Sequence, residues 1–151
     1  MSKSTDDHST RKRILDVSGP LFAARGYDGA TVREICEAAG ANVASVNYHF
    51  GDKSKLYLEV VQQAIKSRTE HIPMDGGLPS DAPPEKRLRA FVNAFMRRRF
   101  DPTSPSWWGE LVGREMRHPT DIARQIVGKN WQQNRQILIS VVKELLENEG
   151  G

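Results

Sequence analysis

Apolar residues recur along most of the chain with a period near 3.6, the spacing that places side chains on one face of an α-helix. The first such stripe predicts a helix from about Thr10 to Arg25 that ends at Gly26. No segment of useful length alternates between apolar and polar residues as a half-buried strand does. The pattern therefore predicts an all-α fold, with the polar residues 1–10 as a disordered tail.

Two short helices follow, joined by a tight turn. Thr31 and Glu34 form a capping-box pattern at the start of a helix that stops at Gly40. A third helix is predicted from Val43 to Phe50, with Asn42 as its cap. The three-residue connection matches the glycine-containing turn of a helix-turn-helix. By itself, this pattern also fits a corner between two helices of an ordinary helical protein.

The remaining helices fall into two groups separated by a linker. Asp52 caps a fourth helix that runs to about Arg68, and the proline- and glycine-rich stretch 71–84 is read as a linker. Beyond it three more helices are predicted, the last of them long. We therefore expect a helix-turn-helix domain over residues 11–70 and a helical effector and dimerisation domain over residues 85–151.

Composition narrows the classes of function. A chain of 151 residues with 38% hydrophobic and 27% charged residues suits one or two small soluble domains. It shows no signal peptide and no apolar run of the roughly 18 residues that a membrane span needs, so we expect a cytoplasmic protein without membrane contact. One cysteine excludes an internal disulfide framework, and four scattered histidines have no metal-ligand spacing. No metal or cofactor is expected, and a net charge of +3 says little about nucleic acid.

The two faces of the predicted third helix carry different chemistry. Val46 and Phe50 share one side at i and i+4. The opposite side is small, polar and aromatic: Ala44, Ser45, Asn47 and Tyr48. A face that enters the major groove of DNA needs small residues for close approach, amides for base edges and hydroxyls for phosphates. Asn47 is therefore the best candidate for reading a base.

Two lysines stand where the helix dipole disfavours cations. Lys53 and Lys55 follow Asp52 at the start of the fourth helix, where each cation costs a few tenths of a kcal/mol, up to about 1, unless an anion lies opposite. Backbone amides at a helix start bind phosphate well, and a neighbouring lysine adds a charge-assisted contact.

The stretch GYDGATVREICEAAGANVASVNYHFGDKSKLY resembles the amino-terminal domain of the tetracycline-repressor (TetR) family of bacterial transcriptional regulators, from about Arg11 to Val61. The matching elements, in order and without gaps, are Gly26-Tyr27, Thr31, Ala39-Gly40, Tyr48-His49-Phe50, Lys53 and Leu56-Tyr57. Asn47 departs from the family pattern, which more often has tyrosine there. Less closely, WWGELVGREMRHPT resembles the second domain of the CecR-like branch.

This resemblance implies a repressor that a small-molecule effector releases from a palindromic double-stranded DNA operator. It also implies that the start of the fourth helix lies against the DNA backbone, so that the anion opposite Lys53 is a phosphate. The residues expected at the DNA interface are Thr31, Arg33, Val43, Ala44, Ser45, Asn47, Tyr48, Lys53 and Lys55.

Two further groups of residues in the second domain attract attention. An effector pocket, which apolar and aromatic side chains would dominate, has as candidates Phe95, Met96, Trp107, Trp108, Met116 and Trp131. Core packing explains each of these equally well. Residues 85–101 are strongly basic and include Arg97, Arg98 and Arg99, a run that we interpret as a solvated face or as partners of acids on neighbouring helices.

The carboxyl end carries an expectation about assembly. Family members normally continue past the long helix, which here starts near Thr120 and ends near Glu147, with two helices that pair with a second subunit. We expect a homodimer that is weakened because the chain stops early. The alternative is a replacement interface on the long helix through Ile137, Val141 and Leu145.

Two other classes of function compete with DNA binding. A helical adaptor that binds protein partners and no DNA would share the same periodicity. An enzyme is disfavoured because no nucleophile, base and orienting group form a recognisable pattern, and no catalytic residue is expected.

Overall fold

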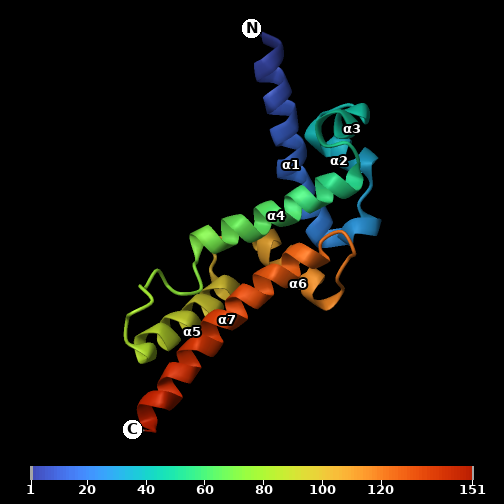
Figure 1. Cartoon of the computed structure of the whole chain (residues 1–151). Helices are drawn as coiled ribbons and strands as arrows, with labels where there is room; N and C mark the ends of the chain where they lie inside the picture. Colours follow the sequence, from blue (N-terminus) through green and yellow to red (C-terminus); the bar gives the residue numbers. More distant parts are fainter. Residues whose placement is uncertain (1, 151) are drawn as a thin grey trace.

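The computed structural model describes residues 2–150, and this part of the chain forms seven helices and no strand (Figure 1). The helices are α1 (Ser2–Gly29), α2 (Val32–Ala39), α3 (Ala44–Phe50), α4 (Lys53–His71), α5 (Pro84–Phe100), α6 (Ser106–Arg117) and α7 (Arg124–Glu149). The predicted all-α class is confirmed. No helix in residues 2–150 combines the length and the apolar character that crossing a membrane requires.

The amino end differs from the sequence-based expectation. α1 begins at Ser2, where the polar sequence predicts a disordered tail over residues 1–10, and Met1 lies outside the described residues. The guanidinium of Arg13 donates to Ser9 Oγ at 2.9 Å and to Thr10 Oγ1 at 3.1 Å. These local hydrogen bonds support helical turns that carry no apolar stripe, which is why periodicity did not reveal them.

The regular part of α1 ends where the sequence predicts. Gly26 has φ 74° and ψ 177°, values outside the helical region, and a short second segment then runs to Gly29. A side chain at Gly26 would be strained by the positive φ and would crowd Arg114 on α6.

One apolar core joins helices of both predicted domains. Its buried members include Ile14, Phe22, Ile35, Val46, Leu56, Tyr57, Leu111 and Val127. Phe22 of α1 meets Tyr57 of α4 edge to face, with ring centroids 4.8 Å apart. Because α6 contributes Leu111 to the same cluster, apolar packing continues from the helix-turn-helix region into the second domain.

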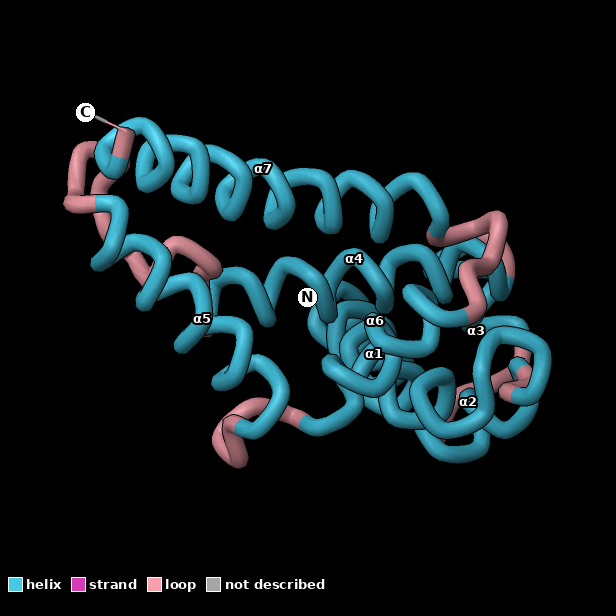
Figure 2. The backbone as a smooth tube through the Cα atoms, turned by 90° about the horizontal axis from the view of Figure 1, so that it is seen from below, coloured by secondary structure: helices cyan, strands magenta, loops and turns pink. Residues whose placement is uncertain are grey.

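α5 packs against α7 (Figure 1), and Figure 2 shows the two helices close together near the carboxyl end and diverging away from it. Arg87 on α5 pairs with Glu144 on α7 at 2.7 Å. The segment between α4 and α5, residues 72–83, is anchored because Ile72 and Met74 are buried with Ala94 in a second, smaller core. The predicted linker is therefore a packed connection.

α7 begins four residues later than expected and continues through Gly128. Thr120, the predicted start, instead uses its backbone N–H to donate to Glu115 Oε2 at 2.9 Å. Its hydroxyl oxygen accepts from the backbone N–H of Ala123 at 3.2 Å. These contacts form a turn that ends α6 and directs the chain into α7.

Candidate nucleic-acid interface

The turn between α2 and α3 is fixed by local hydrogen bonds. Gly40 adopts the left-handed conformation with φ 61° and ψ 40°, and its N–H donates to the carbonyl of Glu37 at 3.2 Å. The next amide, Ala41 N–H, donates to Cys36 O at 2.9 Å. Asn42 Oδ1 accepts from Ala44 N–H at 3.0 Å, and Val43, not the predicted Asn42, directly precedes α3, without a side-chain cap of its own.

The start of α2 is a complete capping box. Glu34 N–H donates to Thr31 Oγ1 at 3.2 Å, while Thr31 N–H donates to Glu34 Oε2 at 3.0 Å. The Thr31 hydroxyl also donates to Glu34 Oε2, at 2.9 Å. The backbone hydrogen bond from Thr31, followed by its hydroxyl and by Arg25, lowers the pKa of Glu34. Thr31 therefore anchors the helix start that would face a phosphate.

α3 presents the face that the sequence predicts. Val46 and Phe50 are buried, with exposed fractions of 0% and 8%. Val43, Ala44, Asn47 and Tyr48 are exposed, Tyr48 at 75%, and Ser45 is half-buried. The solvent-facing surface of α3 therefore consists of small side chains, one amide and one phenol.

His49 lies off this surface. Only 7% of its side chain is exposed, and its Nε2 atom lies 3.7 Å from Asp7 Oδ1 on α1. The ring also packs edge to face against Tyr48, with centroids 4.9 Å apart. His49 thus helps to fix α3 against α1 rather than extending outward.

The start of α4 holds its two lysines differently. Lys53 Nζ lies 4.5 Å from the centre of the Tyr27 ring, a cation–π contact that positions the ammonium group. Lys55 is exposed. Asp52 Oδ1 accepts from Lys55 N–H at 2.8 Å and from Ser54 Oγ at 2.6 Å, and these bonds lower the pKa of Asp52, that from Ser54 most. An ionised Asp52 therefore offsets part of the unfavourable dipole interaction of the lysines.

Figure 1 shows α2 and α3 beside the amino end of α4, far from α5 and the carboxyl end. The nine candidate DNA-binding residues lie on this part of the molecule. Thr31 and Val43 directly precede α2 and α3, and the others lie in α2, in α3 and at the start of α4. Arg33 is exposed and donates from Nε to Glu37 at 2.9 Å. Exposed pairs of this kind are weak, so the arginine can exchange its partner for a phosphate.

A cavity of about 320 Å³ lies between α4, α5, α6 and α7. It is lined by Arg68, Met74, Phe91, Phe95, Arg98, Val112, Met116, Val127, Asn130, Trp131, Asn134, Arg135 and Leu138. Three of the candidate effector residues, Phe95, Met116 and Trp131, are among these.

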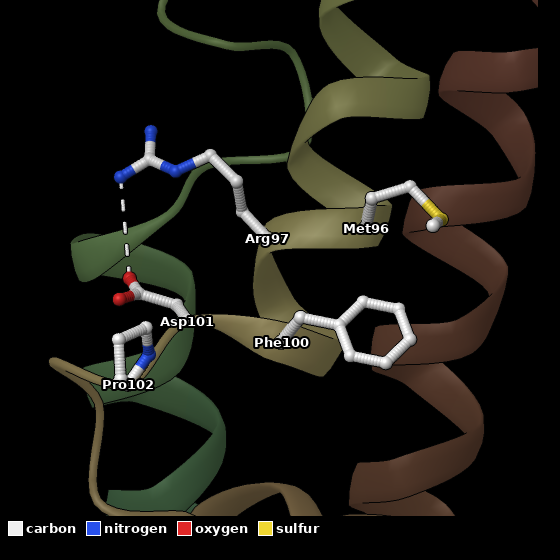
Figure 3. Close-up of a pocket in the computed structure, with 5 residues that line it drawn as sticks. All are labelled: Met96, Arg97, Phe100, Asp101 and Pro102. Carbon is white, nitrogen blue, oxygen red and sulfur yellow. Dashed lines mark ion pairs between the residues drawn. The ribbon is translucent and has the colours of Figure 1, made fainter.

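The other three effector candidates lie elsewhere. Met96 borders a separate, open depression at the end of α5, where it extends to the same side as Phe100 and away from Arg97 and Asp101 (Figure 3). Trp107 and Trp108 pack against the main core, and the Trp107 ring lies over Gly19 of α1, where no side chain intervenes. The apolar stripe of a helix does not show which neighbouring element it faces. For Trp107 and Trp108, core packing is therefore the interpretation that the structure supports, and an effector contact is not.

Sequence reasoning missed the three arginines that line the cavity, Arg68, Arg98 and Arg135. Arg98 stands in the middle of the run that we interpreted as solvated or paired with acids; Arg97 and Arg99 are exposed, but Arg98 is partly buried. Successive helical residues differ by about 100° in direction, so a run of three arginines cannot all share one face. This geometry could have indicated from the sequence that one arginine of the run faces inward.

A helix-turn-helix with an exposed, polar second helix and a lysine held at the next helix start is an arrangement typical of DNA-binding proteins. Residues 14–60 match the sequence profile of the family described as "Bacterial regulatory proteins, tetR family". Residues 84–150 match that of "HTH-type transcriptional dual regulator CecR, C-terminal domain". Residues 14–60 therefore carry a tetR-family domain, and residues 84–150 carry a CecR-type carboxyl-terminal domain.

Curated relatives carry the same type of name. The HTH-type transcriptional repressor AcnR of Corynebacterium efficiens is 37% identical over 78 residues, which cover 50% of this chain and 42% of AcnR. The HTH-type transcriptional regulator SrpR of Pseudomonas putida is 31% identical over 109 residues, or 72% of this chain and 48% of SrpR. The chain thus matches less than half the length of these relatives. Their names favour a DNA-binding regulator over the adaptor alternative.

Solved structures show the same fold. The TetR family regulator PfmR from Thermus thermophilus superposes with a TM-score of 0.70 at 21% identity, covering 92% of this chain and 72% of PfmR. AibR, solved with isovaleryl coenzyme A and operator DNA, has a TM-score of 0.74 at 19% identity and covers 93% and 74% of the two chains.

Proposed function

We propose that this protein is a transcriptional repressor that binds a double-stranded DNA operator through α3 and leaves it when a small-molecule effector binds. The observation that carries this proposal is the exposed face of α3, set beside the lysine-bearing start of α4. The function would be exercised on the bacterial chromosome in the cytoplasm.

The exposed residues divide into base readers and backbone contacts. Asn47 can exchange two hydrogen bonds with N6 and N7 of adenine in the major groove, while Ala44 allows close approach. Tyr48, Lys53 and the amides at the start of α4 suit phosphate oxygens. The Tyr27 ring supports Lys53 in this role because the cation–π contact limits the positions of its ammonium group.

α4 connects the proposed DNA interface to the cavity. Lys53 begins this 19-residue helix and Arg68 lies near its end. At a rise of about 1.5 Å per residue, the two side chains are anchored about 22 Å apart along one rigid element. An effector that prefers a position of α4 incompatible with DNA would weaken operator binding by the ratio of its affinities for the two states.

The operator is proposed to be palindromic and the protein to act as a homodimer. Two reading helices related by two-fold symmetry meet half-sites about 34 to 36 Å apart. Sedimentation at several protein concentrations tests this: a monomer that stays monomeric on operator DNA contradicts it.

Selection of bound sequences from a random DNA pool tests the proposed function most directly. We expect a defined, two-fold symmetric site, to which binding weakens as salt is raised because lysine and arginine displace counterions from phosphates. Binding that shows no sequence preference, or no binding to DNA at all, contradicts the proposal and favours a protein-binding adaptor.

A further inference from the structure

Two arginines meet at the wall of the cavity formed by α4, α5, α6 and α7. Arg98 Nε donates to the carbonyl of Ile72 at 2.8 Å, which fixes the guanidinium group. Its Nη2 atom is buried and has no hydrogen-bond partner among the described residues. Arg68 lies next to it, with Nη2 3.5 Å from the backbone oxygen of Arg98. Buried polar groups normally have partners, so an unsatisfied guanidinium nitrogen requires an explanation.

No acid balances these two charges within residues 2–150. None of the ion pairs found there includes Arg68 or Arg98. The carboxylate of Asp101 instead faces His71, at 3.4 Å, and Arg97, at 4.0 Å. Burial, and then the charge of Arg68, lower the pKa of Arg98 to about 10, and burial also lowers the pKa of Arg68. Like charges placed together without a counter-ion are unfavourable unless an anion joins them.

Most of the rest of the cavity lining is apolar, and its third arginine, Arg135 on α7, is exposed. The walls include Phe91, Phe95, Met116, Val127 and Trp131, with two amide side chains at one side, where Asn134 Nδ2 lies 3.4 Å from Asn130 Oδ1. A volume of about 320 Å³ is near the lower end of the roughly 300–1,000 Å³ typical of small-molecule sites. The cavity therefore suits a compact ligand that is apolar over most of its surface and anionic at one end.

We propose that this cavity binds a carboxylic acid with a compact apolar body, whose carboxylate is held by Arg98 and Arg68. A guanidinium group presents parallel N–H donors that match the two oxygens of a carboxylate, and this planar geometry distinguishes arginine from lysine. The apolar body lies against the aromatic wall of Phe91, Phe95 and Trp131. The inference rests on the proposed function, since it names the chemical class of the effector.

The test compares acids with their own amides, which keep the shape but lose the charge. Titration calorimetry on the full chain would use hexanoate, octanoate and 4-phenylbutyrate, each beside the corresponding amide. We expect at least one acid to bind about tenfold or more tightly than its amide, because hydrogen bonds to a charged group exceed those to a neutral one. Equal affinity of every acid and amide, or binding of no acid, overturns the proposal.

Variants of the arginine run locate the binding. Arg98→Gln is expected to weaken the preferred acid by about tenfold and to remove the preference over the amide, whereas Arg99→Gln, an exposed neighbour on the same helix, leaves both unchanged. Arg98→Lys, which keeps the charge without the planar fork, should fall between them. Thermal unfolding of the ligand-free variants verifies folding. An equal loss in Arg99→Gln and Arg98→Gln contradicts the assignment.

Measuring operator binding with and without the acids and amides distinguishes a failure of this inference from a failure of the proposed function. Operator binding by the wild-type chain that no acid or amide alters, with no acid bound in calorimetry, overturns the acid site and leaves the repressor intact. If the chain binds the acid through Arg98 but binds no DNA, the repressor proposal is overturned and the acid site stands. Release of the operator by the acid, and its loss in Arg98→Gln, supports both.

Discussion

The amide of Asn47 is exposed on the outer face of α3, where it is the side chain best suited to distinguish one base pair from another. We expect Asn47→Ala to cost about 1 to 3 kcal/mol on the preferred operator and to relax discrimination at one base pair. Fluorescence anisotropy on the operator and its single-base variants measures both. Asn93→Ala, an exposed asparagine on α5, is the control, and equal losses on every sequence would make Asn47 a backbone contact.

Lys53 belongs to the opposite category, because a phosphate contact carries no direct sequence information. Lys53→Ala should weaken binding nearly uniformly across sequences and reduce the slope of log affinity against log salt by about one per half-site. Lys66→Ala, near the far end of the same helix, should change neither quantity. A salt slope that Lys53→Ala leaves unaltered removes this lysine from the interface.

At the scale of single elements, α2 depends on its capping box. Thr31→Ala removes the side-chain cap and should lower the free energy of unfolding by about 0.5 to 2 kcal/mol at neutral pH. The same hydrogen bonds lower the folded-state pKa of Glu34. Their contribution is therefore present above the unfolded pKa of about 4.3 and is lost as the pH falls through the lower folded pKa.

Urea unfolding at several pH values tests this dependence. The difference between wild type and Thr31→Ala should shrink below about pH 4. Thr69→Ala, an exposed threonine in the last turns of α4, should show no such pH-dependent difference. If the difference in unfolding free energy between wild type and Thr31→Ala stays constant across the acidic range, the cap does not depend on the ionisation of Glu34.

Two glycines with open space around them should respond in opposite ways to alanine. Gly40 has a positive φ at the turn between α2 and α3, so Gly40→Ala should destabilise the protein by about 1 to 2 kcal/mol through backbone strain alone. Gly128 lies inside α7 without that conformation, so Gly128→Ala should stabilise by about 0.5 to 1 kcal/mol. Urea midpoints give both values. Loss of stability in both variants would contradict the argument from φ.

The sequence predicted those elements whose determinants are local. Gly40 and the capping box of Thr31 set the ends of α2, and the spacing of Val46 and Phe50 fixed which face of α3 is buried, because these depend on residues within one or two turns. The orientation of Trp107 depends instead on Gly19, a residue distant in sequence. Arg98 was misassigned for the same reason, since only the packing of α5 against its neighbours decides which arginine points inward.

At the scale of the whole molecule, α6 is bonded to both α4 and α1. The Tyr57 hydroxyl donates to the buried carboxylate of Glu115 on α6. On the same helix, Arg114 Nε and Nη2 each donate to the carbonyl of Ala23 at 3.2 Å. Burial, and then Glu115, raise the pKa of Tyr57, so its hydroxyl remains a proton donor throughout the ordinary pH range. These bonds tie the second domain to the helix that begins at Lys53.

Removing one of these bonds should weaken the whole fold. Tyr57→Phe keeps the ring contacts with Phe22 but leaves the Glu115 carboxylate with one donor fewer, and we expect the free energy of unfolding to fall by about 1 to 3 kcal/mol. Tyr48→Phe, whose hydroxyl is exposed, provides the matched control and should be neutral in urea unfolding. Similar losses in the two variants would mean that the Tyr57 hydroxyl makes no special contribution.

The single cysteine of the chain gives the helix-turn-helix a chemical reporter. Cys36 lies in α2 with 1% of its surface exposed, and burial raises the pKa of its thiol. Only the thiolate reacts with alkylating reagents, so modification requires that α2 first separate from its neighbours. The rate at which Cys36 of the wild-type protein is alkylated therefore reports how often the helix-turn-helix opens locally. Operator DNA, by holding that unit closed, should slow the reaction without any engineered probe.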